Sequence, residues 1–319
     1  MIEVKELVKK YGNHLAVDHL SFQLESGKIY GLLGPNGAGK STTMNIMTGY
    51  LGATEGSVLI DGHDILQEPE EAKKYIGYLP EIPPLYTDMT VREYLEFAAE
   101  LKKIPKEKRD SSIEEVMKLT KLMDVELRLI KNLSKGYRQR VGLAQAILGF
   151  PDIIILDEPT VGLDPKQIVE IRELIRTLAK KHTIILSSHI LAEVREVCDY
   201  ILIISKGKLV ASDTPENLER LMKGFGTVEI ETKAEPSKIR EILQDIEDIG
   251  EITTDRNSDG TISAKIEAKG ETDIREEIFC AFARNECPLL TLKASGASLE
   301  EVYMKLTQGE EAKTDVGDL

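Results

Sequence analysis

A glycine-rich segment, GPNGAGKST at positions 34–42, contains the residue types that hold a phosphate group. It matches the pattern G-x-x-x-x-G-K-[ST], with Lys40 and Ser41 as its last two residues. Glycines let the backbone curl around an anion, the lysine adds a point charge, and the serine hydroxyl can bind Mg²⁺. We therefore predict nucleotide contacts from Gly34, Pro35, Asn36, Gly37, Ala38, Gly39, Lys40, Ser41 and Thr42.

The residues around this loop give it the required setting. Residues 29–33, IYGLL, form a short apolar run that predicts a buried strand, and residues 41–47, STTMNIM, predict a helix. A helix that begins at the loop directs backbone amides and partial positive charge at the anion. The alternative is a glycine turn that only caps a helix, and a chance match to the pattern has a probability of roughly 1% at average glycine usage.

Two adjacent carboxylates, Asp157 and Glu158, follow the continuous apolar run at residues 153–156. Such a run is typical of a central parallel strand that is covered on both faces, and ligands bind at the carboxyl ends of these strands. We predict that Asp157 holds Mg²⁺ through water and that Glu158 polarises the water that attacks the nucleotide. The alternative is a pair of solvated carboxylates at a strand end.

The segment LSKGYRQR at 133–140 resembles the LSGGQ signature that marks the ATP-binding cassette (ABC) ATPases. The resemblance covers about residues 1–220 and implies an α/β phosphate-loop NTPase fold with a helical subdomain at about 82–150. It also implies two head-to-tail protomers, in which Ser134 and Gly136 contact the γ-phosphate held by the second subunit. Lys135 departs from the first signature glycine, and this variation resembles the exporter branch of the family.

Three further positions match this family. Tyr11 stands where an aromatic residue stacks on adenine, with Val17 nearby, and Asp164 in GLDP matches the loop that signals between the two sites. His189 in LSSH matches the switch histidine that orients the γ-phosphate and the water. Alternatives from the residues alone are a half-buried edge tyrosine and a structural histidine after the strand predicted at 183–186.

Glu81, in IGYLPEIPPLY, departs from the glutamine that the family usually has between its two subdomains. A carboxylate oxygen can ligate Mg²⁺ or water as an amide oxygen does, so we include Glu81 in the nucleotide site and predict that Glu81→Gln retains activity. The sequence LPE and the stretch PLYTDMTVREYLEF resemble cassette ATPases of gliding-motility, copper-processing and drug exporters, the gliding-motility type most of all.

A capping-box pattern at residues 90–93 starts a predicted helix with apolar residues at helical spacing: Val91, Tyr94, Leu95, Ala98 and Leu101. We interpret this stripe as a face packed in the core. In the resembling family this subdomain receives a coupling helix from a membrane protein. We predict that partner contacts lie on the apolar loop at residues 82–86, IPPLY.

Composition limits the classes of partner. A net charge of −14 disfavours nucleic acid, which rewards clustered lysine and arginine. The chain has no apolar run of roughly 18 to 20 residues, and its first residues lack the apolar region of a signal peptide, so we expect a cytoplasmic protein, peripheral on the inner face of the cell membrane. The three cysteines show no C-x-x-C pattern, which predicts buried free thiols.

The pattern changes after about residue 220. Residues 221–307 alternate in the order β-α-β-β-α-β, which suggests a small α+β module of the ferredoxin-like type. A last helix is expected at 299–306, and the acidic tail at 308–319 is expected to be disordered. Regulation, dimer support and plain stability are all open as roles for this module.

These observations favour an ATP-binding and ATP-hydrolysing subunit of an ABC transporter, with ATP and Mg²⁺ as cofactors. Two copies, or one copy with a related chain, would close on ATP and drive export through separate polytopic membrane permease subunits. The alternative is a soluble mechanical or regulatory ABC ATPase, which the lack of a second cassette and the acidic charge disfavour. A GTPase is less supported, because the chain lacks the guanine-reading motif N-K-x-D.

Overall fold

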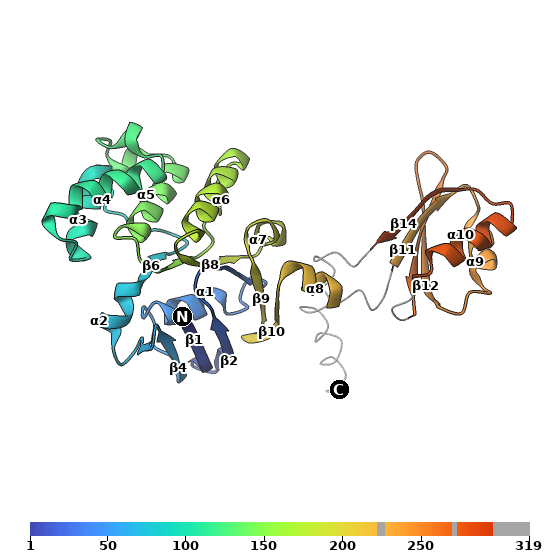
Figure 1. Cartoon of the computed structure of the whole chain (residues 1–319), viewed down its shortest axis with the longest axis horizontal. Coiled ribbons are helices and arrows are strands. Elements are labelled where there is room, and N and C mark those ends of the chain that lie inside the picture. Colours follow the sequence, from blue (N-terminus) through green and yellow to red (C-terminus); the bar gives the residue numbers. More distant parts are fainter. Residues whose placement is uncertain (222–226, 270–272, 296–319) are drawn as a thin grey trace. The chain divides into compact units, whose positions relative to one another are not determined.

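A computed structural model describes residues 1–221, 227–269 and 273–295. The chain divides into two units, Met1–Asp213 and Thr214–Leu319, and each is described by itself (Figure 1). No helix in the described part of the chain is long and apolar enough to cross a lipid bilayer.

The central sheet of the first unit has the strand order β10-β9-β3-β8-β7-β6. Its strands run parallel except for the edge strand β10, which is antiparallel to β9. Every residue of β3, β7 and β8 is buried, as the mainly apolar character of these strands predicts. The carboxyl ends of these three neighbouring parallel strands therefore lie together at one end of the sheet. The six strands are β3 (Ile29–Leu33), β6 (Ile76–Leu79), β7 (Ile153–Leu156), β8 (Thr183–Ser188), β9 (Tyr200–Ser205) and β10 (Lys208–Asp213).

A second, antiparallel sheet has the order β2-β1-β4-β5. Helix α1 (Lys40–Met47) begins directly after the glycine-rich loop, and its buried residues Met44 and Ile46 share one core cluster with residues from both sheets, including Leu20 and Ile155. This shared core fixes the start of α1 against the central sheet. The four strands are β1 (Ile2–Tyr11), β2 (His14–Leu24), β4 (Glu55–Ile60) and β5 (His63–Asp64).

A group of helices lies between β6 and β7 in the sequence, and Figure 1 shows it gathered around α3, α4 and α5. The predicted capping box at Thr90 and Glu93 is present, and the apolar stripe of α3 is buried as expected. Leu101 is an exception, because the helix ends there and the side chain is 65% exposed, while Ala99 is buried instead. These elements are α3 (Val91–Leu101), α4 (Lys106–Leu119) and α5 (Lys135–Ile147), with short 3₁₀ helices at Met123–Val125 and Ile130–Asn132. Helix α2 (Pro69–Ala72) and a 3₁₀ helix at Lys73–Tyr75 come before β6.

Two helices follow the site-bearing strands. Helix α6 (Pro165–Ala179) comes after β7, and helix α7 (Leu191–Val197) comes after β8. The prediction of buried cysteines holds for Cys198, just after α7, whereas Cys280 and Cys287 are partly exposed. All three thiols are free.

The second unit begins with α8 (Pro215–Leu221) and contains a four-stranded antiparallel sheet of order β12-β13-β11-β14. Buried residues of two helices and the sheet, including Ile239, Ile278, Phe282 and Val228, form its core. The helix expected at 299–306 and the tail at 308–319 lie outside the described residues. The elements are β11 (Thr227–Thr232), α9 (Pro236–Leu243), β12 (Ile249–Arg256), β13 (Ile262–Ala268), α10 (Arg275–Arg284) and β14 (Leu289–Ser295).

Candidate nucleotide site

The glycine-rich loop connects β3 to α1 and is closely packed on its inner side. A Cβ atom at Gly34 would lie 2.3 Å from the backbone oxygen of Ile204, and one at Gly39 would lie 2.5 Å from that of Ala16. Gly39 also has a φ of +102°, which side-chain-bearing residues rarely adopt. Both positions therefore require glycine, and the loop delivers the N-terminus of α1 to the carboxyl edge of the sheet.

The ammonium group of Lys40 lies inside this loop. Its Nζ atom donates hydrogen bonds to the backbone oxygens of Gly34 at 2.7 Å and Pro35 at 3.2 Å, and it lies 4.0 Å from Oε1 of Glu158. Burial lowers the pKa of Lys40 from its usual value, while the nearby carboxylates oppose that shift. The loop thus holds a desolvated cation among carbonyl dipoles and carboxylates.

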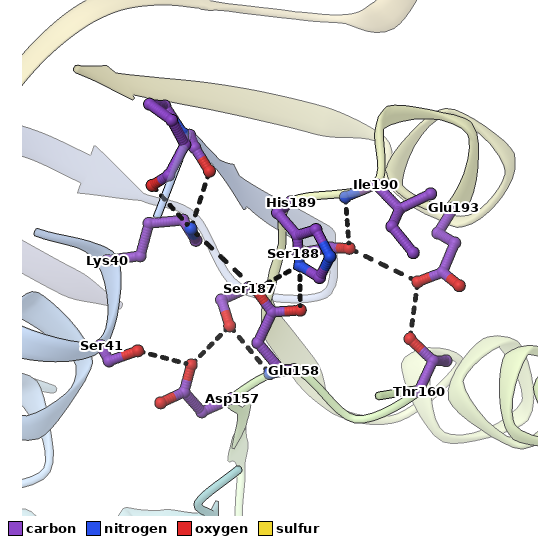
Figure 2. A network of polar contacts seen from close by, with 12 residues as sticks. Lys40, Ser41, Asp157, Glu158, Thr160, Ser187, Ser188, His189, Ile190 and Glu193 are labelled. Atoms are coloured by element: carbon purple, nitrogen blue, oxygen red, sulfur yellow. Dashed lines mark hydrogen bonds and ion pairs between the residues drawn. The ribbon is translucent and has the colours of Figure 1, made fainter. Parts of the chain in front are cut away.

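Two hydroxyl groups, one from the start of α1 and one from the end of β8, contact Asp157 after β7 (Figure 2). Ser41 donates to Oδ1 of Asp157 at 3.2 Å, and Ser187, from the end of β8, donates to the same oxygen at 2.6 Å. The Oγ atom of Ser187 also accepts a hydrogen bond from the backbone N–H of Glu158 at 2.8 Å. Ser187 therefore holds the carboxylate of Asp157 and the backbone of Glu158. Sequence analysis missed it, although it stands in the LSSH segment.

Glu158 and His189 contact each other across the site (Figure 2). The Nδ1 atom of His189 lies 3.1 Å and 3.0 Å from the two carboxylate oxygens of Glu158. Glu158 is buried and has a left-handed backbone with φ of +48°, which is uncommon for a residue other than glycine. The imidazole and the carboxylate thus form a pair at the ends of β7 and β8, with His189 on the solvent side.

Lys40, Ser41, Glu158 and His189 line a cavity of about 350 Å³, whereas Asp157 and Ser187 do not. Tyr11, 48% exposed, lies on its wall, whereas Val17 is fully buried beside Gly39 and does not line it. Gly34 and Pro35 do not line it either, and they act instead through their carbonyl contacts with Lys40. The wall also includes three residues that no sequence motif indicated: His14, Ala16 and Val161.

Three of the residues chosen from the sequence lie away from this cavity. Ser134 caps α5 and accepts a hydrogen bond from the backbone of Tyr137, while Asp164 caps α6 through a capping box with Gln167. A Cβ atom at Gly136 would lie 2.5 Å from the side chain of Gln167, so the two helix starts are close neighbours. The N-termini of α5 and α6 therefore form a pair that is separate from the glycine-rich loop at the start of α1.

Glu81 lies between this cavity and a larger one of about 780 Å³. Ser41 and Glu81 line both cavities, and Asp157 lines the larger one. The larger cavity also has strongly exposed apolar side chains on its wall, Tyr50 at 83% and Ile82 at 82%. A ligand in one cavity and a partner in the other would therefore contact the same two residues.

Known proteins with similar sequences are ABC transporter components. The family model described as "ABC transporter" matches residues 17–161. The chain is 33% identical to the bacitracin transport ATP-binding protein BcrA of Bacillus licheniformis, over 97% of this chain and 98% of that protein. It is 36% identical to the lantibiotic transport ATP-binding protein SrtF of Streptococcus pyogenes, over 69% of this chain and 95% of that protein.

Solved structures give the same result. An ATP-binding subunit of an ABC transporter is similar with a TM-score of 0.64 and 31% identity, over 69% of this chain and 92% of that one. A dimeric ATP-binding cassette in a post-hydrolysis state, bound to ADP and Pi, is similar with a TM-score of 0.62 and 27% identity, over 67% of this chain and 98% of that one. The chain therefore belongs to the ATP-binding subunits of ABC transporters and is an ABC ATPase.

Proposed function

We propose that this chain hydrolyses ATP in the cavity around Lys40 and that closure of an ATP-bound dimer drives export through separate membrane subunits. The observation that carries the proposal is the cluster at the ends of β3, β7 and β8, where Lys40, Asp157, Glu158 and His189 converge beside the glycine loop. Phosphoryl transfer depends on positioning and on stabilisation of charge, and this cluster supplies both.

In this proposal Glu158 polarises the attacking water, and His189 orients that water and the γ-phosphate. The 3.0 Å contact between them supports a shared role, because the imidazole fixes the direction of the carboxylate. Lys40 neutralises phosphate charge, and the loop amides at the start of α1 receive the phosphate oxygens. Tyr11 stacks on adenine at the cavity wall, with Val17 supporting the loop from beneath.

The residues present fit Mg²⁺, which prefers oxygen ligands. The hydroxyl of Ser41 and the carboxylate of Asp157 are already 3.2 Å apart, and both would hold the ion, Asp157 through water. When bound, Mg²⁺ would neutralise the negative charge that develops on the phosphates. Glu81 would add a further oxygen from the opposite wall.

Ser134, Gly136 and Asp164 would serve the nucleotide of a second subunit. Ser134 is exposed at the start of α5, away from the cavity of its own chain, and a helix N-terminus attracts anions. A head-to-tail dimer would bring this start against the γ-phosphate of the other chain. The structural relative described as dimeric supports this arrangement.

The membrane partner would bind at the larger cavity, with contacts on the loop at 82–86. Its wall presents apolar side chains to solvent, and exposed apolar surface of this kind marks sites of protein interaction. The relatives named for bacitracin and lantibiotic transport support an exporter of the drug-export type. The chain would then be cytoplasmic and peripheral on the inner face of the cell membrane.

We also propose a domain division at about 1–220, 221–307 and 308–319, with the helical subdomain at about 82–150. The order of the strands, β12-β13-β11-β14, with two helices between them in sequence, supports a ferredoxin-like second domain. Its role would be regulation or support of the dimer.

Affinity purification of the tagged chain from its native membranes tests the coupling to transport. We expect a polytopic membrane protein in stoichiometric amount from the unmodified chain, and loss of that protein from Ile82→Glu, which puts a charge on the wall of the larger cavity. Leu127→Glu is the matched control, because Leu127 is 79% exposed but does not line that cavity. Recovery of soluble partners alone would favour a mechanical or regulatory ATPase and contradict the transporter proposal.

Glu81→Gln should keep its ATPase rate within about threefold, a barrier difference under ~1 kcal/mol. An amide oxygen replaces a carboxylate oxygen at the same place, so the ligand for Mg²⁺ or water is retained. Steady-state phosphate release at saturating Mg-ATP measures this rate. Loss of turnover in the folded variant would show that the negative charge of Glu81 is required.

A further inference from the structure

We propose that Glu193 on α7 is a positioning residue that holds Glu158 and His189 at their working separation without touching ATP. The inference rests on the proposed function, in which these two residues act on the attacking water. Glu193 does not line the nucleotide cavity, and Figure 2 shows it on the other side of the pair from Lys40.

A single oxygen of Glu193 joins the two segments that carry the pair. Its Oε2 atom accepts hydrogen bonds from Thr160 at 2.6 Å and from Ser188 at 3.4 Å. Thr160 lies two residues after Glu158, and Ser188 directly precedes His189. The carboxylate therefore connects the segment after β7 to the end of β8, on the side away from the cavity.

The connection also reaches the helix that carries Glu193 itself. The hydroxyl oxygen of Ser188 accepts a hydrogen bond from the backbone N–H of Ile190 at 3.0 Å, which fixes the turn between His189 and α7. A displacement of α7 would thus move His189 and, through Thr160, the segment that follows Glu158. The pair would keep its geometry while the surrounding elements move.

The burial of Glu193 supports a role beyond packing. The residue is 7% exposed, and a buried carboxylate is costly unless it is hydrogen-bonded or paired. Its other oxygen lies 3.9 Å from Nη2 of Arg172 on α6, which also pairs with Glu196. The Nε atom of Arg172 is the buried side-chain polar atom without a hydrogen-bond partner in the described part of the chain. An apolar residue at position 193 would stabilise the fold at least as well as this buried carboxylate. The presence of a carboxylate here therefore supports a role other than stability.

The left-handed backbone of Glu158 explains why this connection is needed. Ser187 holds its N–H group on one side, and Thr160, held by Glu193, restrains the chain on the other. An uncommon backbone conformation persists only where neighbouring contacts enforce it. Without Glu193 the segment after Glu158 loses one of these two restraints, and the carboxylate can turn away from His189.

The test compares Glu193→Met, in which a side chain of similar length has no oxygen to accept these hydrogen bonds, with Thr160→Val and the double variant. Valine matches the shape of threonine and removes only the hydroxyl donor, so the fold is retained. We expect kcat for ATP hydrolysis to fall about tenfold in each single variant, because small misplacements of catalytic groups are costly, with KM for ATP unchanged. The double variant should lose no more than either single one, since both changes break the same connection.

Glu196→Met is the matched control, because it removes another carboxylate of α7 that pairs with Arg172 but does not reach Thr160 or Ser188. It should keep its kcat. Unchanged kcat in folded Thr160→Val, or losses that multiply in the double variant, would overturn the inference alone. Full turnover in Glu158→Gln would instead remove the proposed role of Glu158, and with it the basis of the inference.

Discussion

Glu158→Gln will lower the rate of ATP hydrolysis by about 10³-fold while ATP still binds. The glutamine keeps the shape of the side chain but cannot accept a proton from water, and its amide loses the charge that pairs with His189. The cavity, the loop and Lys40 are unchanged, so affinity for ATP remains. Phosphate release and binding of a fluorescent ATP analogue separate the two effects.

The same variant should accumulate as an ATP-bound dimer, because the step that opens the dimer is removed. Light scattering coupled to size-exclusion chromatography, with and without Mg-ATP, measures this shift. Glu81→Gln makes the same chemical change on another carboxylate of the same cavity and should remain in equilibrium with its monomer. A variant that stays monomeric at saturating ATP would count against the dimer cycle.

Lys40→Met will weaken ATP binding by about 100-fold, the effect of losing one charge-assisted hydrogen bond. Methionine fills a similar volume in the loop, so the backbone conformation that the glycines require is preserved. The loss is in affinity, which isothermal titration with ATP measures directly. Lys28→Met is the matched control, since Lys28 directly precedes the opposite end of β3 and does not line the cavity. Equal affinity in both variants would exclude Lys40 as a phosphate ligand.

The pH dependence of binding has a defined sign. In the proposed site Lys40 binds phosphate as a cation, and burial lowers the pKa of its ammonium group in the free protein. Affinity should therefore be full at low pH and fall as pH rises, beginning below the pH at which an ordinary lysine deprotonates. This decline is absent in Lys40→Met, which has no group to titrate there.

Short sequence motifs were enough to predict the main local elements of the first unit. The glycine loop, the carboxylates after an unbroken apolar run and the capping box at Thr90 each depend on residues close together in sequence, and the structure has all three local elements. The wrong prediction that Leu101 is buried also came from a local pattern. Periodicity predicts which residues share a face of a helix but not where the helix ends. Cys280 and Cys287 were expected inside because cysteines usually are, yet their exposure depends on packing within the second unit.

The sequence by itself determined the chemistry of this protein, because the residues that curl around phosphate and those that end a buried strand are specified locally. Tertiary structure alone decided which side chains support them. Ser187 meets Asp157 and Glu158, and Glu193 meets Thr160, only after parallel pairing brings strands some thirty residues apart to one edge. Serine, threonine and a helical glutamate are ordinary in type and spacing, so their roles arise from contacts that no local pattern encodes.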